Sequence, residues 1–254
     1  MEASSVRRPL RFLLLGMLRR MLRWRGRRLE LPPGTTIVVI APHPDDETFG
    51  CGLLLAHPPA IGIERHVVFL TRGEASHAGH PALSPGELAR RRTGEAGDAA
   101  RRLGLPASAL HFLDLPDGRL GQLDDGASDD RIAALLDRLR PDVVLVPDER
   151  DGSSEHAATA RLAARLARRP GTTWRRLAYL VWAAWSPRLL IRIACGRGPV
   201  RLHHVAGGAA DKGRAAGAYR SQTESVAPWT RPVLPEDFVA ALARDDEFFL
   251  PLDN

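Results

Sequence analysis

A histidine and three acidic residues crowd into one short stretch of this 254-residue chain: His43 stands between two prolines, and Asp45, Asp46 and Glu47 follow it. Imidazole nitrogens and carboxylate oxygens are ligands that zinc and related divalent cations prefer. A purely structural explanation is a helix start, since acidic residues commonly occupy a first helical turn. That explanation accounts for one acid but not for the group, so the stretch favours a metal site.

The spacing separates metal ligands from a candidate base. His43 and Asp46 are three residues apart at a strand-to-helix turn, close enough to converge on one ion. Asp45 projects differently, which leaves its carboxylate free to act on a metal-bound water. A catalytic zinc needs a third protein ligand and an open fourth position. His156, at the start of another expected helix, is the best third candidate, with a structural hydrogen bond at a helix entry as its alternative.

Alternating strand and helix patterns surround these residues. The sequence predicts strands at 36–41, 65–71, 109–113 and 142–147, and helices at 47–56, 86–103, 129–139 and 155–168. This order predicts an α/β fold with a Rossmann-like, doubly wound, mostly parallel sheet in a single domain. Open sheets of this kind form their sites in loops at the carboxyl ends of the strands, where His43 and His156 are expected.

The pattern changes in the last third of the chain. Three apolar segments, 177–185, 188–194 and 199–205, predict later strands that could form a hairpin at the sheet edge. Helices are predicted at about 210–221 and about 235–243.

Charge is distributed unevenly along the sequence. The net charge is +6, yet the first 30 residues carry nine arginines against two glutamates, and the remainder has 27 basic and 28 acidic residues. A nearly neutral body argues against a nucleic-acid groove, which needs basic residues clustered on the domain itself. Two cysteines exclude a disulfide framework and a four-cysteine zinc site.

Residues 1–30 are interpreted as a basic, amphipathic N-terminal arm, and 31–254 as the remaining domain. The longest uncharged run, 12–18, is too short to span a bilayer, which needs about 20 apolar residues. No small-residue cleavage site of a signal peptide follows it. The three- and four-residue spacing of its apolar residues fits a helix at an anionic membrane surface, with contact through 7–28. A flexible arm and a helix packed on the body are the alternatives.

We expect a cytoplasmic protein, with peripheral contact to the inner membrane face left open. The sequence does not indicate an oligomeric state.

These motifs together resemble the LmbE-like or PIG-L family of zinc-dependent de-N-acetylases, which remove acetyl groups from N-acetylglucosamine units. The resemblance covers most of residues 36–222. The segments that carry it are Pro42-His-Pro-Asp-Asp-Glu47, Thr71-Arg-Gly-Glu74, Arg92-Thr-Gly-Glu95 with Leu103-Gly104, Leu113-Asp-Leu-Pro-Asp-Gly118, and Lys212 with Tyr219-Arg-Ser-Gln222.

The resemblance implies an enzyme that hydrolyses the acetamide of an N-acetylated amino sugar on a lipid or small-molecule conjugate. It implies that His43, Asp46 and His156 bind Zn²⁺, with Fe²⁺ as an alternative for such a site. It implies that Asp45 is the general base and that Asp117 contacts sugar hydroxyls. Two further candidates for substrate contacts follow the second strand, Arg72 and Glu74, with an ion-paired structural role as their alternative.

One segment departs from the family pattern. The family motif usually reads Asp-x-His-Pro-Asp-His, whereas this chain reads Asp151-Gly-Ser-Ser-Glu-His156. The acid is retained as Glu155, which would steady a catalytic group, but the first histidine is replaced by Ser153. Ser153 could donate a weaker hydrogen bond to the substrate, His77 or His80 could substitute for the histidine, or Asp45 alone could protonate the leaving amine. The alternative for His77 and His80 is that they are exposed loop residues without a part in catalysis.

Two other function classes fit the sequence less well. A nucleotide-binding Rossmann domain is disfavoured because Gly50 and Gly52 lack the third glycine of the dinucleotide fingerprint, and the nearby acids would repel a pyrophosphate. A catalytically degenerate, membrane-tethered glycan-binding module is supported by Ser153 alone and opposed by the intact ligand set.

Overall fold

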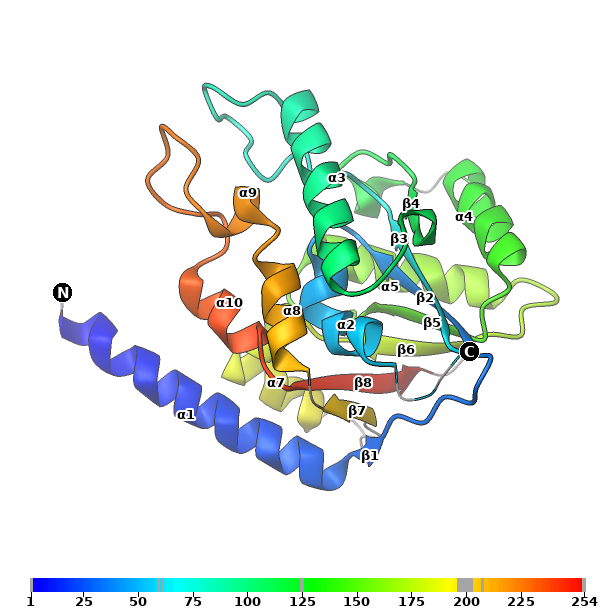
Figure 1. Ribbon diagram of the computed structural model, residues 1–254, viewed down its shortest axis with the longest axis horizontal. Coiled ribbons are helices and arrows are strands. Elements are labelled where there is room, and N and C mark those ends of the chain that lie inside the picture. Colours follow the sequence, from blue (N-terminus) through cyan, green and yellow to red (C-terminus); the bar gives the residue numbers. More distant parts are fainter. Residues whose placement is uncertain are drawn as a thin grey trace.

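The computed structural model describes residues 2–58, 60, 62–123, 126–195, 203–206 and 208–252. Its strands are β1 (Arg27–Arg28), β2 (Thr36–Ala41), β3 (Glu64–Phe69), β4 (Leu110–Phe112), β5 (Val143–Pro147), β6 (Arg175–Tyr179), β7 (His203–Ala206) and β8 (Asp246–Leu252). Within the described residues they form one sheet in the order β1-β7-β8-β6-β5-β2-β3-β4 (Figure 1). Strand β8 runs antiparallel to both its neighbours, and the other pairs are parallel.

Helices cover both faces of this sheet. They are α1 (Glu2–Arg25), α2 (Asp46–Ala56), α3 (Pro85–Arg102), α4 (Gly126–Leu139), α5 (Ser154–Ala167), α6 (Trp182–Trp185), α7 (Pro187–Ala194), α8 (Ala209–Ala216), α9 (Arg220–Thr223) and α10 (Glu236–Leu242), with 3₁₀ turns at Ala107–Ala109 and Leu120–Gln122. Alternate residues of β2 serve different layers: Ile37 and Val39 belong to the core under α2, α3 and α8, whereas Val38 and Ile40 belong to the core under α4 and α5. The prediction of an α/β, Rossmann-like, doubly wound, mostly parallel sheet is confirmed.

The strand order reverses between β2 and β5. From β2 the chain winds through α2 and α3 to β3 and β4 on one side, whereas β5 leads through α5 to β6 on the other. The loops that follow β2 and β5 therefore diverge from adjacent strands and leave a crevice at the carboxyl edge, where open α/β sheets bind ligands. Those two loops carry the predicted metal ligands.

The predicted strands 36–41, 65–71, 109–113 and 142–147 correspond to β2, β3, β4 and β5, with boundaries that agree to within two residues. The predicted helices 47–56, 86–103, 129–139 and 155–168 correspond to α2 to α5, of which α4 begins three residues earlier. The predicted helix at 235–243 is α10. The predicted helix at 210–221 is two helices, because α8 ends at Ala216 and the chain turns before α9.

Of the later strand predictions, 177–185 is right only as far as Tyr179, and 188–194 is wrong. Strand β6 ends at Tyr179 and residues 182–185 form α6, while the predicted strand 188–194 lies in α7. The helix begins there because Ser186 accepts a hydrogen bond from the Leu189 amide and Pro187 occupies the first helical turn. Buried Leu190 and Ile193 then repeat at helical spacing. Of the predicted strand 199–205, residues 203–205 lie in β7 and the earlier ones lie outside the described residues.

Helix α1 packs along α7, and β1 follows it at the edge of the sheet. Leu15 and Leu22 are buried in the core, and buried Arg19 forms an ion pair with Asp246 and donates to the Ala241 carbonyl over 2.9 Å. None of the described helices combines the length and hydropathy that crossing a membrane requires.

A buried ion pair holds α2, which begins at the site. Lys212 Nζ lies 2.7 Å from Glu247 Oε1 and donates to the Phe49 carbonyl over 2.8 Å. The Glu247 carboxylate accepts the Leu53 and Leu54 amides in turn. The carbonyl of Phe49 and these two amides thus have partners outside the helix, and this anchors α2 against α8 and β8.

Candidate metal centre and active site

The loop after β2 holds its side chains through an unusual backbone. Asp45 has φ 137° and ψ −32°, a conformation that L-residues rarely adopt and that costs about 1–3 kcal/mol. Glu47 stabilises it by accepting the Asp45 amide over 3.0 Å, and the Tyr219 hydroxyl donates to the same carboxylate. Helix α2 starts at the next residue, so Asp45 and Asp46 point in different directions.

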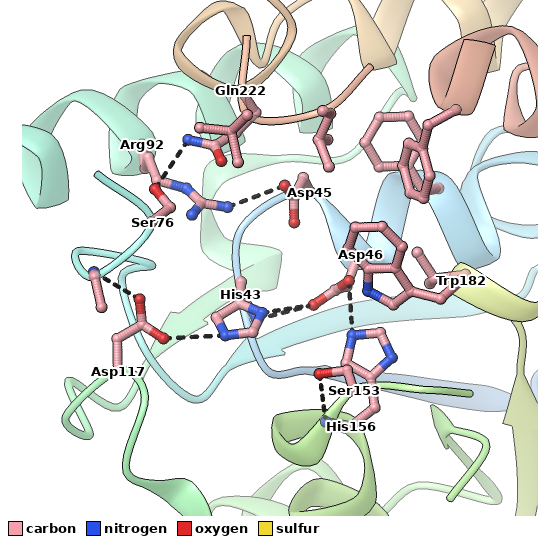
Figure 2. Close-up of a pocket in the computed structure, with 16 residues that line it drawn as sticks. His43, Asp45, Asp46, Ser76, Arg92, Asp117, Ser153, His156, Trp182 and Gln222 are labelled. Carbon is pink, nitrogen blue, oxygen red and sulfur yellow. Dashed lines mark hydrogen bonds and ion pairs between the residues drawn. The ribbon is translucent and has the colours of Figure 1, made fainter. Parts of the chain in front are cut away.

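Three donor groups converge at the crevice (Figure 2). The Asp46 carboxylate bridges two imidazoles, with Oδ2 3.1 Å from His43 Nδ1 and Oδ1 3.1 Å from His156 Nε2. One ligand atom from each of the three residues lies within 4.8 Å of the others. His43 comes from the loop after β2 and His156 from the first turn of α5, so the topology brings together the predicted ligands.

Each imidazole has a carboxylate on its other nitrogen. His156 Nδ1 donates to Asp151 Oδ2 over 2.7 Å, and Asp151 also accepts the Val181 and Ala183 amides. His43 Nε2 lies 3.0 Å from Asp117 Oδ1. Such partners fix the orientation of a ligating histidine and raise its basicity. Asp117, expected from the resemblance to touch sugar hydroxyls, lies where it orients His43.

Charge at the site fits a divalent cation. Burial by itself would lower the pKa of both histidines, but their carboxylate partners raise it to about 9 for His43 and about 10 for His156. Burial opposes ionisation of Asp46, yet the two imidazoles hold its pKa below the usual range. The raised pKa of each histidine shows that positive charge is favoured around Asp46. Two imidazole nitrogens and a carboxylate are suitable donors for a cation such as Zn²⁺ at this position.

Asp45 is not part of this donor set and is paired with Arg92. Arg92 Nη2 lies 3.0 Å from Asp45 Oδ2 and also donates to the Pro44 carbonyl, while Nη1 donates to the Gly73 carbonyl over 3.0 Å. Burial raises the pKa of Asp45 to about 7, against the opposing effect of Arg92. Gly73 has φ +69°, and a Cβ there would overlap the guanidinium. This glycine therefore makes room for Arg92.

The three donor residues, Asp45 and Arg92 line a cavity of about 280 Å³. One side is polar, formed by these groups together with Ser76, Asp117, Ser153 and Gln222. The opposite side is apolar, formed by Phe49, Val181, Trp182, Val233, Leu234 and Phe238. The ring centroids of Trp182 and Phe238 lie 4.7 Å apart, which makes this wall a packed aromatic surface.

The remaining predicted residues take varied places. Ser153 caps α5 by accepting the His156 amide over 3.4 Å and lines the cavity. The Glu155 carboxylate accepts the Gly118 and Leu120 amides and lies 3.9 Å from His43 Nε2. Arg72 lies outside the cavity, paired with Asp114. Glu74 also lies outside and accepts the Asp117 amide over 3.0 Å.

His77 and His80, the candidate substitutes for the missing histidine, do not line the cavity. Both are buried against Trp229, with centroid distances of 5.3 Å and 4.9 Å. They therefore join two loops instead of facing the site.

Sequence reasoning gave no role to Arg92, Asp151, Trp182 or Gln222. Arg92 and Gln222 stand in motifs quoted for the resemblance, and Asp151 opens the segment that contains Ser153 and His156. An arginine in a long helix ordinarily faces solvent, so only its burial beside Asp45 reveals the pairing. Trp182 stands in a segment expected to be a core strand, which explains a tryptophan there at least as well as a substrate contact does.

Comparisons with known proteins identify the family of this chain. The profile of the PIG-L family, described as GlcNAc-PI de-N-acetylase, matches residues 38–167. A 1D-myo-inositol 2-acetamido-2-deoxy-alpha-D-glucopyranoside deacetylase from Kineococcus radiotolerans is 31% identical over 169 residues. That alignment spans 53% of this chain and 45% of the relative, so the chain matches less than half of that protein's length.

Solved structures share the architecture. The conserved protein TT1542 from Thermus thermophilus is 32% identical, with a TM-score of 0.54 over 73% of this chain and 79% of its own. The N,N'-diacetylchitobiose deacetylase from Pyrococcus horikoshii is 21% identical, with a TM-score of 0.51 over 70% and 69% of the two chains. The second likeness concerns the fold alone. Since the family profile covers half of the sequence and includes the loop and helix starts that carry His43, Asp46 and His156, the chain belongs to the PIG-L family.

Proposed function

We propose that the protein is a metal-dependent hydrolase that removes the acetyl group from an N-acetylated amino sugar carried on a lipid or a small-molecule conjugate. The observation that carries the proposal is the arrangement of three cation donors beside a buried acid that is not among them. His43, Asp46 and His156 supply the donors and Asp45 the acid, all in one cavity. The name of the relative from Kineococcus radiotolerans, a deacetylase of an inositol glycoside, supports this reaction class.

Each side chain has a part in the proposed reaction. A Zn²⁺ ion held by the three donors would polarise the amide carbonyl and lower the pKa of a water molecule in the site, and Fe²⁺ is an alternative occupant. Asp45 takes the proton from the attacking water, and its pKa of about 7 suits a base near neutral pH. It then returns that proton to the departing amine. Arg92 holds the Asp45 carboxylate in place throughout.

The two sides of the cavity fit an amino-sugar conjugate. Asp117, Ser76 and Gln222 offer hydrogen bonds to sugar hydroxyls on the polar side. The aromatic side accepts an apolar face of the sugar or of the group attached to it. Ser153, whose oxygen accepts the His156 amide, keeps a hydroxyl proton that can be donated to the developing oxyanion.

Metal analysis and acetate release test the proposal together. We expect purified protein to contain about one equivalent of a divalent metal and to release acetate from N-acetylglucosaminyl conjugates. Asp45→Asn should keep the metal and lose activity by about 10²–10⁴-fold, the contribution typical of a general base. His156→Ala should lose both.

Control measurements separate this enzyme from a glycan-binding module. A folded wild-type protein that binds the conjugates yet contains no metal and releases no acetate would contradict the proposal. Retention of full metal content and rate in His156→Ala would contradict the ligand assignment. Circular dichroism of each variant establishes that the fold is intact.

A further inference from the structure

Large exposed apolar side chains gather in one region of the surface. Where side chains are described, the large hydrophobic residues that are exposed belong to α1 or to α7, which packs against it: Leu10, Leu13, Leu14, Met17, Trp24 and Ile191. Trp24 is 86% exposed and Met17 62%. Single exposed apolar residues are ordinary, but a group confined to one helix and its neighbour marks an interaction site.

Helix α1 has two apolar sides with different partners. Its inner side carries Leu15 and Leu22, seven residues apart and buried in the core. Its outer side carries five of the exposed residues at spacings of three, four and seven: Leu10, Leu13, Leu14, Met17 and Trp24. We call these five the outer face of α1. Figure 1 shows the helix at the margin of the molecule, with one long side turned away from the sheet.

Positive charge borders the outer face. Five exposed arginines lie in or directly after α1, and two more lie on α7: Arg20, Arg23, Arg25, Arg27 and Arg28, then Arg188 and Arg192. No acidic residue occurs between Glu2 and Glu30 in the sequence. An apolar row with basic borders and a tryptophan is the pattern of a helix lying in the surface of an anionic bilayer.

We propose that the outer face of α1 docks the protein onto an anionic phospholipid surface. The apolar row enters the boundary between headgroups and acyl chains, and the arginines contact lipid phosphates. A second copy of the chain is the less suitable occupant, because two such faces would bring their arginines together without acidic partners.

Docking there would place the cavity close to the lipid. Arg11 of α1 forms an ion pair with Asp237 of α10 and lies 4.7 Å from the centroid of the Trp185 ring. Trp185 packs edge-on against Trp182, which lines the aromatic side of the cavity. Helix α1 and the cavity therefore share the wall that α6 and α10 form. The proposal concerns this surface and holds whatever reaction the cavity carries out.

Vesicle sedimentation with the full chain tests the docking. We expect the protein to sediment with vesicles of equal parts phosphatidylcholine and phosphatidylglycerol at low salt, less with phosphatidylcholine alone, and less again at high salt. Replacement of Leu13, Met17 and Trp24 by serine should weaken the partition coefficient at least 10-fold, since these exposed side chains supply much of the apolar area that enters the lipid. Replacement of Arg20, Arg23 and Arg25 by serine should weaken it similarly and reduce its dependence on salt.

A matched control removes the same charge elsewhere. Replacement of three arginines that are exposed on α4, on α5 and just beyond α5 (Arg138, Arg161 and Arg168) by serine should leave binding within twofold of wild type.

The proposal is overturned if wild type does not sediment with anionic vesicles at low salt, or if the serine variant of the outer face binds as wild type does. It is also overturned if the control variant loses as much binding as the arginine variant of α1. Sedimentation equilibrium tests a second copy of the chain as the occupant. A wild-type dimer that the outer-face variant abolishes, with no vesicle binding by either protein, would also overturn the proposal. Unchanged metal content and acetate release from a soluble conjugate in every variant keep this result separate from the proposed activity.

Discussion

At the scale of single residues, Arg92 determines the surroundings of Asp45. Its guanidinium spans Asp45, the Pro44 carbonyl and the Gly73 carbonyl, and it is 2% exposed. A buried charge that loses its partner costs far more than a surface pair contributes. The pair therefore fixes the position of a carboxylate whose backbone is already strained.

Arg92→Leu should lower stability by about 3–5 kcal/mol, because Asp45 loses its buried partner. Acetate release should fall at least about 10-fold, since the carboxylate is no longer held over the site. Arg91→Leu on the same helix is the matched control, because that side chain is 48% exposed and should change stability by less than about 0.5 kcal/mol. Urea unfolding and acetate release measure both variants. Equal losses in the two would show that Arg92 acts only as part of the helix.

His77 should give stability a dependence on pH. Burial, then the neighbouring His80 and the guanidinium groups of Arg92 and Arg91, lower the pKa of His77 below its ordinary value of about 6.5. As pH falls below about 6.5 the unfolded chain takes up a proton at this residue before the folded chain does. Stability from this residue is thus complete above pH 6.5 and is lost below it.

His77→Phe keeps a ring against Trp229 and removes the proton. We expect the decrease in unfolding free energy between pH 7.5 and pH 5 to be smaller in this variant than in wild type. Urea denaturation at the two pH values measures it. The same decrease in both proteins would contradict the assignment, because the other titrating groups contribute equally to each.

The three candidate metal ligands could be identified from the sequence because their chemistry is local. His43 and Asp46 share one turn, and His156 stands at a helix start after an expected strand. The pairing of Arg92 with Asp45 could not be predicted, since it joins residues 47 positions apart and depends on the angle at which α3 crosses the loop. The burial of His77 likewise depends on a ring supplied by Trp229.

At the scale of elements, the close packing of α2 against its neighbours fixes the position of Asp46, the first residue of that helix. Gly50 faces the ring of Tyr179, and a Cβ there would overlap that ring. Tyr179 cannot move aside easily, because it is fully buried in β6 and its hydroxyl donates to the Ile40 carbonyl over 3.1 Å. A displaced α2 would carry Asp46 with it.

Gly50→Ala should therefore destabilise the protein by about 1–3 kcal/mol, the usual cost of overpacking, and should weaken metal binding. Gly94→Ala is the control within another helix, where a Cβ meets nothing within 4 Å and should stabilise by about 0.5–1 kcal/mol. Thermal unfolding and metal content distinguish the two. A Gly50→Ala protein as stable as wild type would mean that α2 has more freedom than this packing allows.

The central elements were more predictable than those at the antiparallel end of the sheet. Strands β2 and β5 are buried on both faces, so their β-branched runs indicate strands directly. In α7, buried Leu190 and Ile193 lie at helical spacing on either side of Arg192, and the deciding signal was the Ser186 cap before Pro187. Strand β8 was not predicted, because its place is decided by antiparallel pairing with β6 and β7, two segments that are distant from it in the sequence.

At the scale of the whole molecule, α1 serves the core and the surface together. Leu15 and Leu22 belong to the core, each worth about 1.5–3 kcal/mol of burial, and Arg19 reaches Asp246 at the start of β8. Removal of residues 2–25 would expose this core and unpair Asp246. A truncated chain would therefore confuse loss of docking with loss of folding, and point substitutions on the outer face are the cleaner test.

Arg19→Met should lower the unfolding free energy by about 3 kcal/mol, because the Asp246 carboxylate, 7% exposed, loses its partner. Arg20→Met, one position along the helix on an exposed side, should cost less than about 0.5 kcal/mol. Both changes remove one positive charge from α1, but only Arg20 is exposed, so vesicle binding should fall in Arg20→Met while stability falls in Arg19→Met. Urea unfolding followed by tryptophan fluorescence, with vesicle sedimentation at matched salt, measures the two properties separately. If Arg19→Met were as stable as wild type, α1 would be an appendage that rests on the body without supporting it, and the inner and outer sides of the helix would have to be reassigned.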